Sequence, residues 1–209
     1  MLTGELTDTT IANGLKEALT KGTERAVTTL SKNGGYGKNL LYKIVVPEDL
    51  QNFSKTLRKV GLGSQVDFFE TKMNEAAEEA CKKATPIFID AITGMTLDDV
   101  RKILMGKQNA ATEYFRQKTY ASLKTDYFPV VRTKMEEIGV IADYNKLVTR
   151  YNAIPFTPKV EFNLEDYVTD KALKGLFSML EKTEKDIREN PAARTTDLLK
   201  RVFAEQDKK

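Results

Sequence analysis

The sequence contains no histidine and a single cysteine, Cys81, among its 209 residues. Without histidine the chain cannot form a Ser-His or Cys-His nucleophile pair, an HExxH zinc motif or a histidine-ligated metal or haem site. One cysteine excludes an internal disulfide and a cysteine-rich zinc site. Catalysis would have to use carboxylate, lysine or tyrosine side chains. We therefore expect a protein that is not an enzyme and that holds no metal and no cofactor.

Long hydrophobic runs are also missing. Apolar runs such as 44–46 and 86–89 are far shorter than the roughly 20 residues of a membrane-spanning helix. The first residues, MLTGELTDTT, lack the basic segment and the apolar core of a secretory signal. The sequence thus predicts a protein that does not span a membrane and that is either cytoplasmic or the mature part of an exported protein.

No charge of one sign dominates the chain. The 33 lysine and arginine residues and the 30 aspartate and glutamate residues leave a net charge of +3, and both signs are interspersed. Because nucleic-acid-binding proteins usually concentrate basic residues in one stripe, we expect no nucleic-acid partner. With 41% hydrophobic residues, the chain has the composition of a globular protein, and we expect one domain over residues 1–209 with a frayed tail from about residue 204.

Apolar residues recur at helical spacing along most of the chain. Thr7 or Asp8 is suited to cap the first helix, Thr96 and Asp99 have capping-box spacing, and Gly106 is suited to end a helix. The pattern predicts an all-α bundle of eight or nine helices over 7–30, 47–60, 64–93 with a kink at Pro86, 96–105, 106–127 with an end or a bend at Pro129, 130–138, 143–154, 163–190 and 193–203.

Two extended segments leave room for one short two-stranded β ribbon in this bundle. LLYKIVV, residues 40–46, is β-branched and apolar, and residues 159–162 lie in a loop that contains two prolines. Two segments of this length do not make a larger sheet.

Four sequence blocks carry a resemblance to a known family. They are TDTTIANGLKEALTKGTERAV, MNEAAEEACKKATPIFIDAITGMTLDDVRKIL, GKQNAATEYFRQKT and ENPAARTTDLLKRVF. Over almost its entire length the chain resembles the bacterial family catalogued as domain of unknown function 4197. The resemblance implies an all-helical domain that is made with an export signal or a lipoprotein leader, and it implies no accepted activity. We accordingly expect a mature chain in the periplasm or cell envelope, with the cytoplasm as the alternative.

Two cations interrupt the apolar faces of segment 106–129. A helical wheel places Lys118 in the middle of the larger apolar face and Arg116 within a smaller one, which predicts that Lys118 is the more buried of the two. A cation in this position either reaches the surface along its apolar neighbours, pairs with a carboxylate such as Glu113 or Asp126, or binds an anionic ligand.

Three other motifs have simpler structural explanations. Glu75, Glu78 and Glu79 precede two lysines and are predicted to form a solvated, ion-paired helix face. The glycine-rich segment NGGYGKN lacks the GK[ST] ending of a phosphate-binding loop and follows a helix. Arg194 precedes two threonines that can cap the last helix, although it could also join that helix start in holding a carboxylate or phosphate.

Small residues on one face of segment 64–93 suggest a ligand. They either let a neighbouring helix approach closely or leave an elongated apolar space that suits an acyl chain. The leading hypothesis is non-catalytic binding of a hydrophobic small molecule, most concretely a fatty acid, in a pocket between helices. The predicted apolar lining is Phe69, Met73, Ala77, Ala80 and Phe115, and the predicted partners of the carboxylate are Lys118, Arg116 and Tyr114.

Two alternatives stand beside this hypothesis. A structural or partner-binding protein of the bacterial cell envelope would need no small ligand and would expose an apolar patch, for instance near Phe68 and Ile89. A histidine-free enzyme would need a lysine or glutamate in a cleft.

Overall fold

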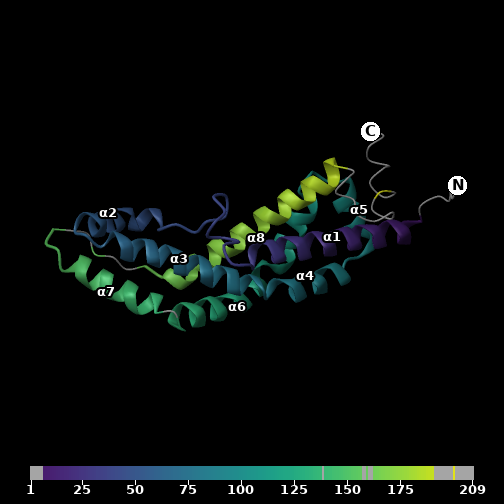
Figure 1. The fold of residues 1–209 in the computed structure, drawn as a ribbon. Helices are drawn as coiled ribbons and strands as arrows, with labels where there is room; N and C mark the ends of the chain where they lie inside the picture. Colours follow the sequence, from purple (N-terminus) through teal and green to yellow (C-terminus); the bar gives the residue numbers. More distant parts are fainter. Residues whose placement is uncertain (1–6, 138, 157–158, 160–161, 191–199, 201–209) are drawn as a thin grey trace. The chain divides into compact units, whose positions relative to one another are not determined.

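The computed structural model describes residues 7–137, 139–156, 159, 162–190 and 200. In this part of the chain all regular structure is helical, and no strand is present (Figure 1). The predicted all-α class is confirmed. The elements are α1 (Asp8–Leu30), the 3-10 helix η1 (Glu48–Leu50), α2 (Gln51–Lys59), α3 (Gly63–Cys81), α4 (Ala84–Thr93), α5 (Leu97–Met105), α6 (Ala110–Glu137), α7 (Val140–Asn152) and α8 (Leu164–Glu189). Of the last predicted helix, only Lys200 lies within the described residues.

Helix termini follow the signals in the sequence. The amide of Thr10 donates to the Thr7 hydroxyl at the start of α1. Thr96 and Asp99 form both hydrogen bonds of a capping box at the start of α5, and Gly106 is the residue at which α5 ends. These local predictions are confirmed because each needs only residues within one turn of helix.

The two prolines within helices have different effects. The long helix predicted over 64–93 is not kinked at Pro86 but interrupted at Lys82 and Lys83, and Pro86 lies within the first turn of α4, where an amide hydrogen has no intrahelical acceptor. Pro129 does not end α6, which continues to Glu137, and the alternative of a bend there stays a prediction. The Pro129 side chain is exposed, so its ring does not disturb the packing of the core.

The predicted ribbon is not observed. Residues 40–42 form a turn, and residues 43–47 have no regular secondary structure and pair with no strand among the described residues. Two residues of the predicted second strand, 160 and 161, lie outside the described residues.

The helices group into two compact units. The first comprises the described parts of Met1–Thr28, Ala84–Leu123 and Leu176–Lys209, and the second comprises those of Thr29–Lys83 and Lys124–Gly175. Helices α6 and α8 contribute residues to both units, so neither unit is one uninterrupted stretch of chain. The extent of a single domain, 1–209, stays a prediction.

An aromatic cluster and a buried carboxylate organise the first unit. The Phe88 ring lies 5.4 Å from that of Phe115 and 6.0 Å from that of Phe177, which joins α4, α6 and α8. On α8, buried Glu184 accepts the amides of Ala111 and Thr112 at 2.9 Å each. These amides belong to the first turn of α6, where they have no intrahelical acceptor, so Glu184 fixes where α6 begins.

The second unit holds its long connection through polar side chains of α3. Buried Asn74 accepts the Ile44 amide and donates to the Ile44 carbonyl, both at 2.8 Å. Glu78 accepts the amides of Tyr36 and Gly37 at 3.1 and 3.2 Å. The connection therefore bonds to helix α3 at Ile44 instead of to a second strand. Glu78 is 7% exposed, which contradicts its predicted place on a solvated face, because the glycine-rich connection covers that part of α3.

Buried hydroxyl and thiol groups complete this unit. Tyr36 is fully buried and donates to the Ala172 carbonyl at 2.7 Å. Its ring lies against Gly175, where an added Cβ would come within 2.7 Å of the ring. Tyr127 and the free thiol of Cys81 are also buried, and the Tyr127 hydroxyl lies 3.4 Å from the Cys81 carbonyl. Only glycine at position 175 leaves space for the ring of Tyr36.

Glu78 and its neighbour Glu79 allow a matched test of the connection. Glu78→Ala should lower the free energy of unfolding by about 2–3 kcal/mol, because it leaves two amides of the connection without their acceptor. Glu79→Ala should change it by less than about 0.5 kcal/mol, because Glu79 is half-exposed and its only ion pair within the described ranges is with exposed Lys82. Urea unfolding measures both values, and equal losses would contradict the assigned role of Glu78.

The buried acidic groups predict a loss of stability in alkali. Burial raises the pKa of Cys81 to about 12, and it also raises the pKa values of Tyr36 and Tyr127. In the unfolded chain the thiol ionises near pH ~8.5. Above that pH the unfolded state binds fewer protons, so the stability that is fully present below it declines toward pH 12. Urea midpoints measured from about pH 8 to pH 11 should fall, and less steeply in Cys81→Ala; a constant midpoint would contradict the assignment.

Candidate functional site

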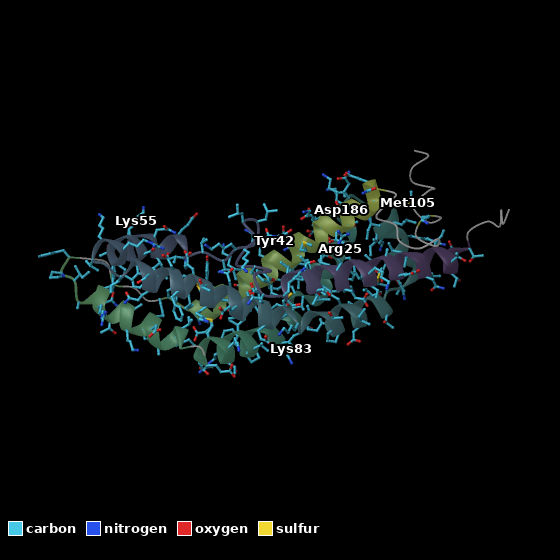
Figure 2. All side chains as sticks on the ribbon, viewed as in Figure 1. Arg25, Tyr42, Lys55, Lys83, Met105 and Asp186 are labelled. Carbon is cyan, nitrogen blue, oxygen red and sulfur yellow. The ribbon has the colours of Figure 1, made fainter. Side chains whose placement is uncertain are left out.

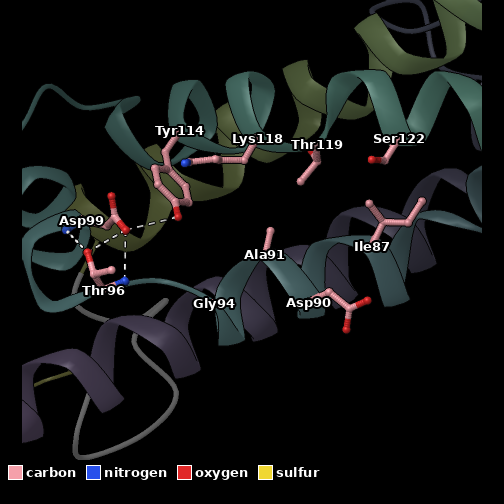
Figure 3. A pocket seen from close by; sticks show the side chains of 10 residues that line it. All are labelled: Ile87, Asp90, Ala91, Gly94, Thr96, Asp99, Tyr114, Lys118, Thr119 and Ser122. Carbon is pink, nitrogen blue, oxygen red and sulfur yellow. Dashed lines mark hydrogen bonds between the residues drawn. The ribbon is translucent and has the colours of Figure 1, made fainter.

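The first unit contains an open pocket of about 470 Å³ between α4, α5 and α6 (Figure 3). Ile87 and Ala91 form its apolar side on α4, and α6 supplies the opposite wall. The full lining is Ile87, Asp90, Ala91, Gly94, Thr96, Asp99, Tyr114, Lys118, Thr119 and Ser122. Two of the predicted ligand residues, Tyr114 and Lys118, therefore face one pocket.

One end of this pocket is polar. The Asp99 carboxylate accepts the Thr96 amide at 3.0 Å and the Thr96 hydroxyl at 2.8 Å, and the Tyr114 hydroxyl lies 3.5 Å away. The hydrogen bonds from Thr96 lower the pKa of Asp99, and the nearby charge of Lys118 lowers it further. Partial burial raises the pKa of Tyr114. Asp99 is thus held as an anion close to the cation that was expected to bind a ligand.

Lys118 extends along the pocket toward Tyr114 (Figure 3). Its Nζ lies 5.8 Å from the centre of the Tyr114 ring, and among the described residues no carboxylate lies within ion-pair distance of it. Asp90, on α4, points away from Lys118 in Figure 3.

The predicted order of burial of the two cations is wrong. Lys118 is exposed, whereas Arg116 is half-buried, with its guanidinium 4.8 Å from the Phe177 ring and 3.5 Å from Glu113. In the first unit the buried stripe of α6 is Ala111, Phe115, Thr119 and Leu123. Thr119 can occupy this stripe because its hydroxyl donates to the Phe115 carbonyl at 2.7 Å. The buried position is therefore Thr119, the residue after Lys118, and Lys118 itself lies outside the stripe.

The predicted apolar lining is divided between the units. Phe115 belongs to the aromatic cluster of the first unit. Met73, Ala77 and Ala80 belong to the second unit, are fully buried, and line neither this pocket nor the one described next. Of the predicted lining, Phe69 lines the pocket described next, and Phe115 lines a cavity of only about 20 Å³ between α1, α6 and α8. Arg194, the other predicted anion partner, lies outside the described residues.

The second unit contains a more enclosed pocket of about 260 Å³ between α3 and α7, the α3–α7 pocket. Its lining is Ser64, Gln65, Phe68, Phe69, Val140, Asp143, Lys146 and Arg150. Lys146 pairs with Asp143 at 3.3 Å, and Arg150 makes no ion pair within the described part of the chain. Sequence reasoning missed these cations, although their spacing of four residues places both on one face of a helix.

The apolar wall of the α3–α7 pocket is aromatic. Phe69 is buried and stacks on Tyr144, with ring centres 5.8 Å apart. Burial raises the pKa of Tyr144 to about 12, so this hydroxyl stays neutral at ordinary pH. Phe68 is 48% exposed and lies under Lys72, whose Nζ is 5.2 Å from the ring centre. The pocket thus combines a fixed aromatic base with a ring that a ligand can cover.

The residues that the structure describes contain neither a metal-binding cluster nor a membrane-spanning helix. No group of three or more cysteine, aspartate and glutamate side chains could hold a metal ion there. No helix in the described ranges has both the length and the apolar character needed to cross a bilayer.

Fold and pockets together define an all-helical protein with a small-molecule-sized pocket in each unit. The family model described as "Protein of unknown function (DUF4197)" matches residues 5–204, and the chain belongs to this family. The resemblance seen in the sequence is thereby confirmed. No curated protein and no solved structure matches the chain.

Substituting the two cations of α6 separately tests their assigned environments. Lys118→Met should change the free energy of unfolding by less than about 0.5 kcal/mol, because Lys118 is exposed and unpaired among the described residues. Arg116→Met should cost about 1 kcal/mol through loss of the contact with Phe177. Urea denaturation of both variants measures the difference, and a larger loss for Lys118→Met would contradict this description of α6.

Proposed function

We propose that the protein binds, without transforming, a hydrophobic small molecule with a carboxylate end, such as a fatty acid, and that the α3–α7 pocket is the site. The observation that carries the proposal is an aromatic wall, Phe68 and Phe69, in one pocket with Arg150, a cation that makes no ion pair among the residues that the structure describes. A mostly apolar lining with a few placed polar groups is the usual form of a ligand site.

Phe68 supplies most of the apolar area that a ligand would cover. An alkyl chain in the pocket would cover the exposed half of the Phe68 ring. Removing that area from water is worth on the order of 1–2 kcal/mol. Phe69 is already buried against Tyr144, so it adds little area but holds the wall of the pocket in place before a ligand binds.

The net charges around the two pockets also favour the α3–α7 pocket as the site for a carboxylate. Lys146 and Arg150 outnumber Asp143, which leaves one net positive charge around the α3–α7 pocket. Lys118 in the first unit shares its pocket with Asp90 and Asp99, which leaves one net negative charge there. An added carboxylate is therefore attracted in the α3–α7 pocket and repelled in the other.

The start of α3 adds a weaker attraction. Leu62 precedes this helix and has no side-chain cap, and the first-turn residues Ser64 and Gln65 line the α3–α7 pocket. Uncapped amides at a helix start favour a negative group. The pocket volume, about 260 Å³, is at the small end for ligand sites and favours a medium-length chain over a long one.

A cell-envelope address, expected from the family resemblance, forms part of the same proposal. The second candidate function is a partner-binding protein of the envelope, and the observation in its favour is the 48% exposed side chain of Phe68, one of the two residues predicted for such a patch.

A charge reversal in each pocket tests the choice of site. Arg150→Glu should weaken binding of dansyl-labelled undecanoic acid at least about tenfold, because it places a carboxylate beside that of the ligand. Lys118→Glu makes the same change in the other pocket and should leave the affinity within about twofold. Fluorescence titration gives both affinities, with unlabelled decanoate as competitor.

The outcomes separate the site from the function. Equal affinities of the Arg150→Glu and parent proteins would overturn the α3–α7 site. Absence of binding by the parent, together with no lipid retained in native mass spectrometry of protein purified without detergent, would overturn fatty-acid binding altogether.

A further inference from the structure

The connection between α1 and η1 exposes two adjacent leucines. Leu40 is 94% exposed and Leu41 is 76% exposed, while the next residue, Tyr42, which is labelled in Figure 2, is buried. Single exposed apolar residues are ordinary on protein surfaces, but two neighbours at the apex of one turn leave a concentrated apolar point in water. The ligand-binding proposal does not use this turn.

The turn is held in place by its own backbone and by α3. Asn39 accepts the amide of Leu41 through its side chain and the amides of Tyr42 and Lys43 through its carbonyl. Glu78 binds the chain before the turn, at Gly37, and Asn74 binds it after the turn, at Ile44. These hydrogen bonds fix the backbone that carries the two leucines. Burying the leucines against another surface therefore requires little additional ordering of the backbone.

Basic residues surround this apex. Residues 31–47, SKNGGYGKNLLYKIVVP, contain three lysines and no acidic residue. Lys32, Lys38 and Lys43 are exposed, and of these Lys43 lies 3.4 Å from Glu70. An apolar apex with lysines on both sides complements a surface that is apolar below and anionic at its boundary.

We propose that residues 39–43 form a membrane-docking tip, which inserts Leu40 and Leu41 into the interface of an anionic lipid bilayer while the flanking lysines contact its headgroups. The tip offers a protein partner no strand edge, because the amides of Leu41, Tyr42 and Lys43 already bond to Asn39. A deformable lipid interface needs no such edge. Two leucines and a few lysines give weak, reversible attachment that depends on salt.

Vesicle co-sedimentation with the full chain tests the tip. The parent protein should bind phosphatidylcholine vesicles that contain a third phosphatidylglycerol, and should not bind pure phosphatidylcholine vesicles. The double variant Leu40→Ser/Leu41→Ser should lose at least about fivefold in the bound fraction, and Lys38→Glu should lose less. Circular dichroism checks that both variants fold.

A control variant defines the outcomes. Leu97→Ser/Met105→Ser removes exposed apolar residues of α5 and should bind vesicles as the parent does. Lack of parent binding to anionic vesicles, equal binding to pure phosphatidylcholine, or undiminished binding of the Leu40→Ser/Leu41→Ser protein would each overturn the proposal. An equal loss of binding in the Leu97→Ser/Met105→Ser protein would also overturn it, because the contact would then not be specific to the tip.

Discussion

Backbone amides that are buried outside regular hydrogen bonding must find acceptors, and in both units helix side chains supply them. Asn74 and Glu78 on α3 receive the amides of the connection before α2, and Glu184 on α8 receives the first amides of α6. The pockets depend on this arrangement. The start of α6 determines where Tyr114 and Lys118 lie, and the same helix α3 that binds the connection carries Phe68 and Phe69 on its surface.

Sequence reasoning predicted what local spacing determines and failed where distant segments meet. The capping box at Thr96 and the stop at Gly106 need only one helical turn, and both are present. Glu78 and Glu79 look alike in the sequence, but only Glu78 is buried, because a segment about forty residues earlier bonds to it. No helical wheel contains that information.

The candidate site shows the same division. The residues predicted as one lining do not lie together. Most are packed core positions, and Phe69 alone lines the proposed ligand pocket, because periodicity identifies a buried face without showing what fills the space beside it. The helical wheel predicts the wrong burial for Lys118 because it treats Thr119 as a polar surface residue. Thr119 is a core residue, since its hydroxyl is satisfied within the helix. Lys146 and Arg150 were identifiable as cations on one helix face, but their aromatic neighbours come from another helix.

The hydrogen bond from Tyr36 to Ala172 joins residues that are 136 positions apart. During synthesis on the ribosome, the glycine-rich connection must wait until α8 has emerged before its tyrosine can be enclosed beside Gly175. The second unit therefore cannot be completed by an N-terminal fragment, because it needs contacts between residues that are far apart in the sequence. Until α8 arrives, the nascent chain carries an uncovered aromatic ring that a chaperone can hold.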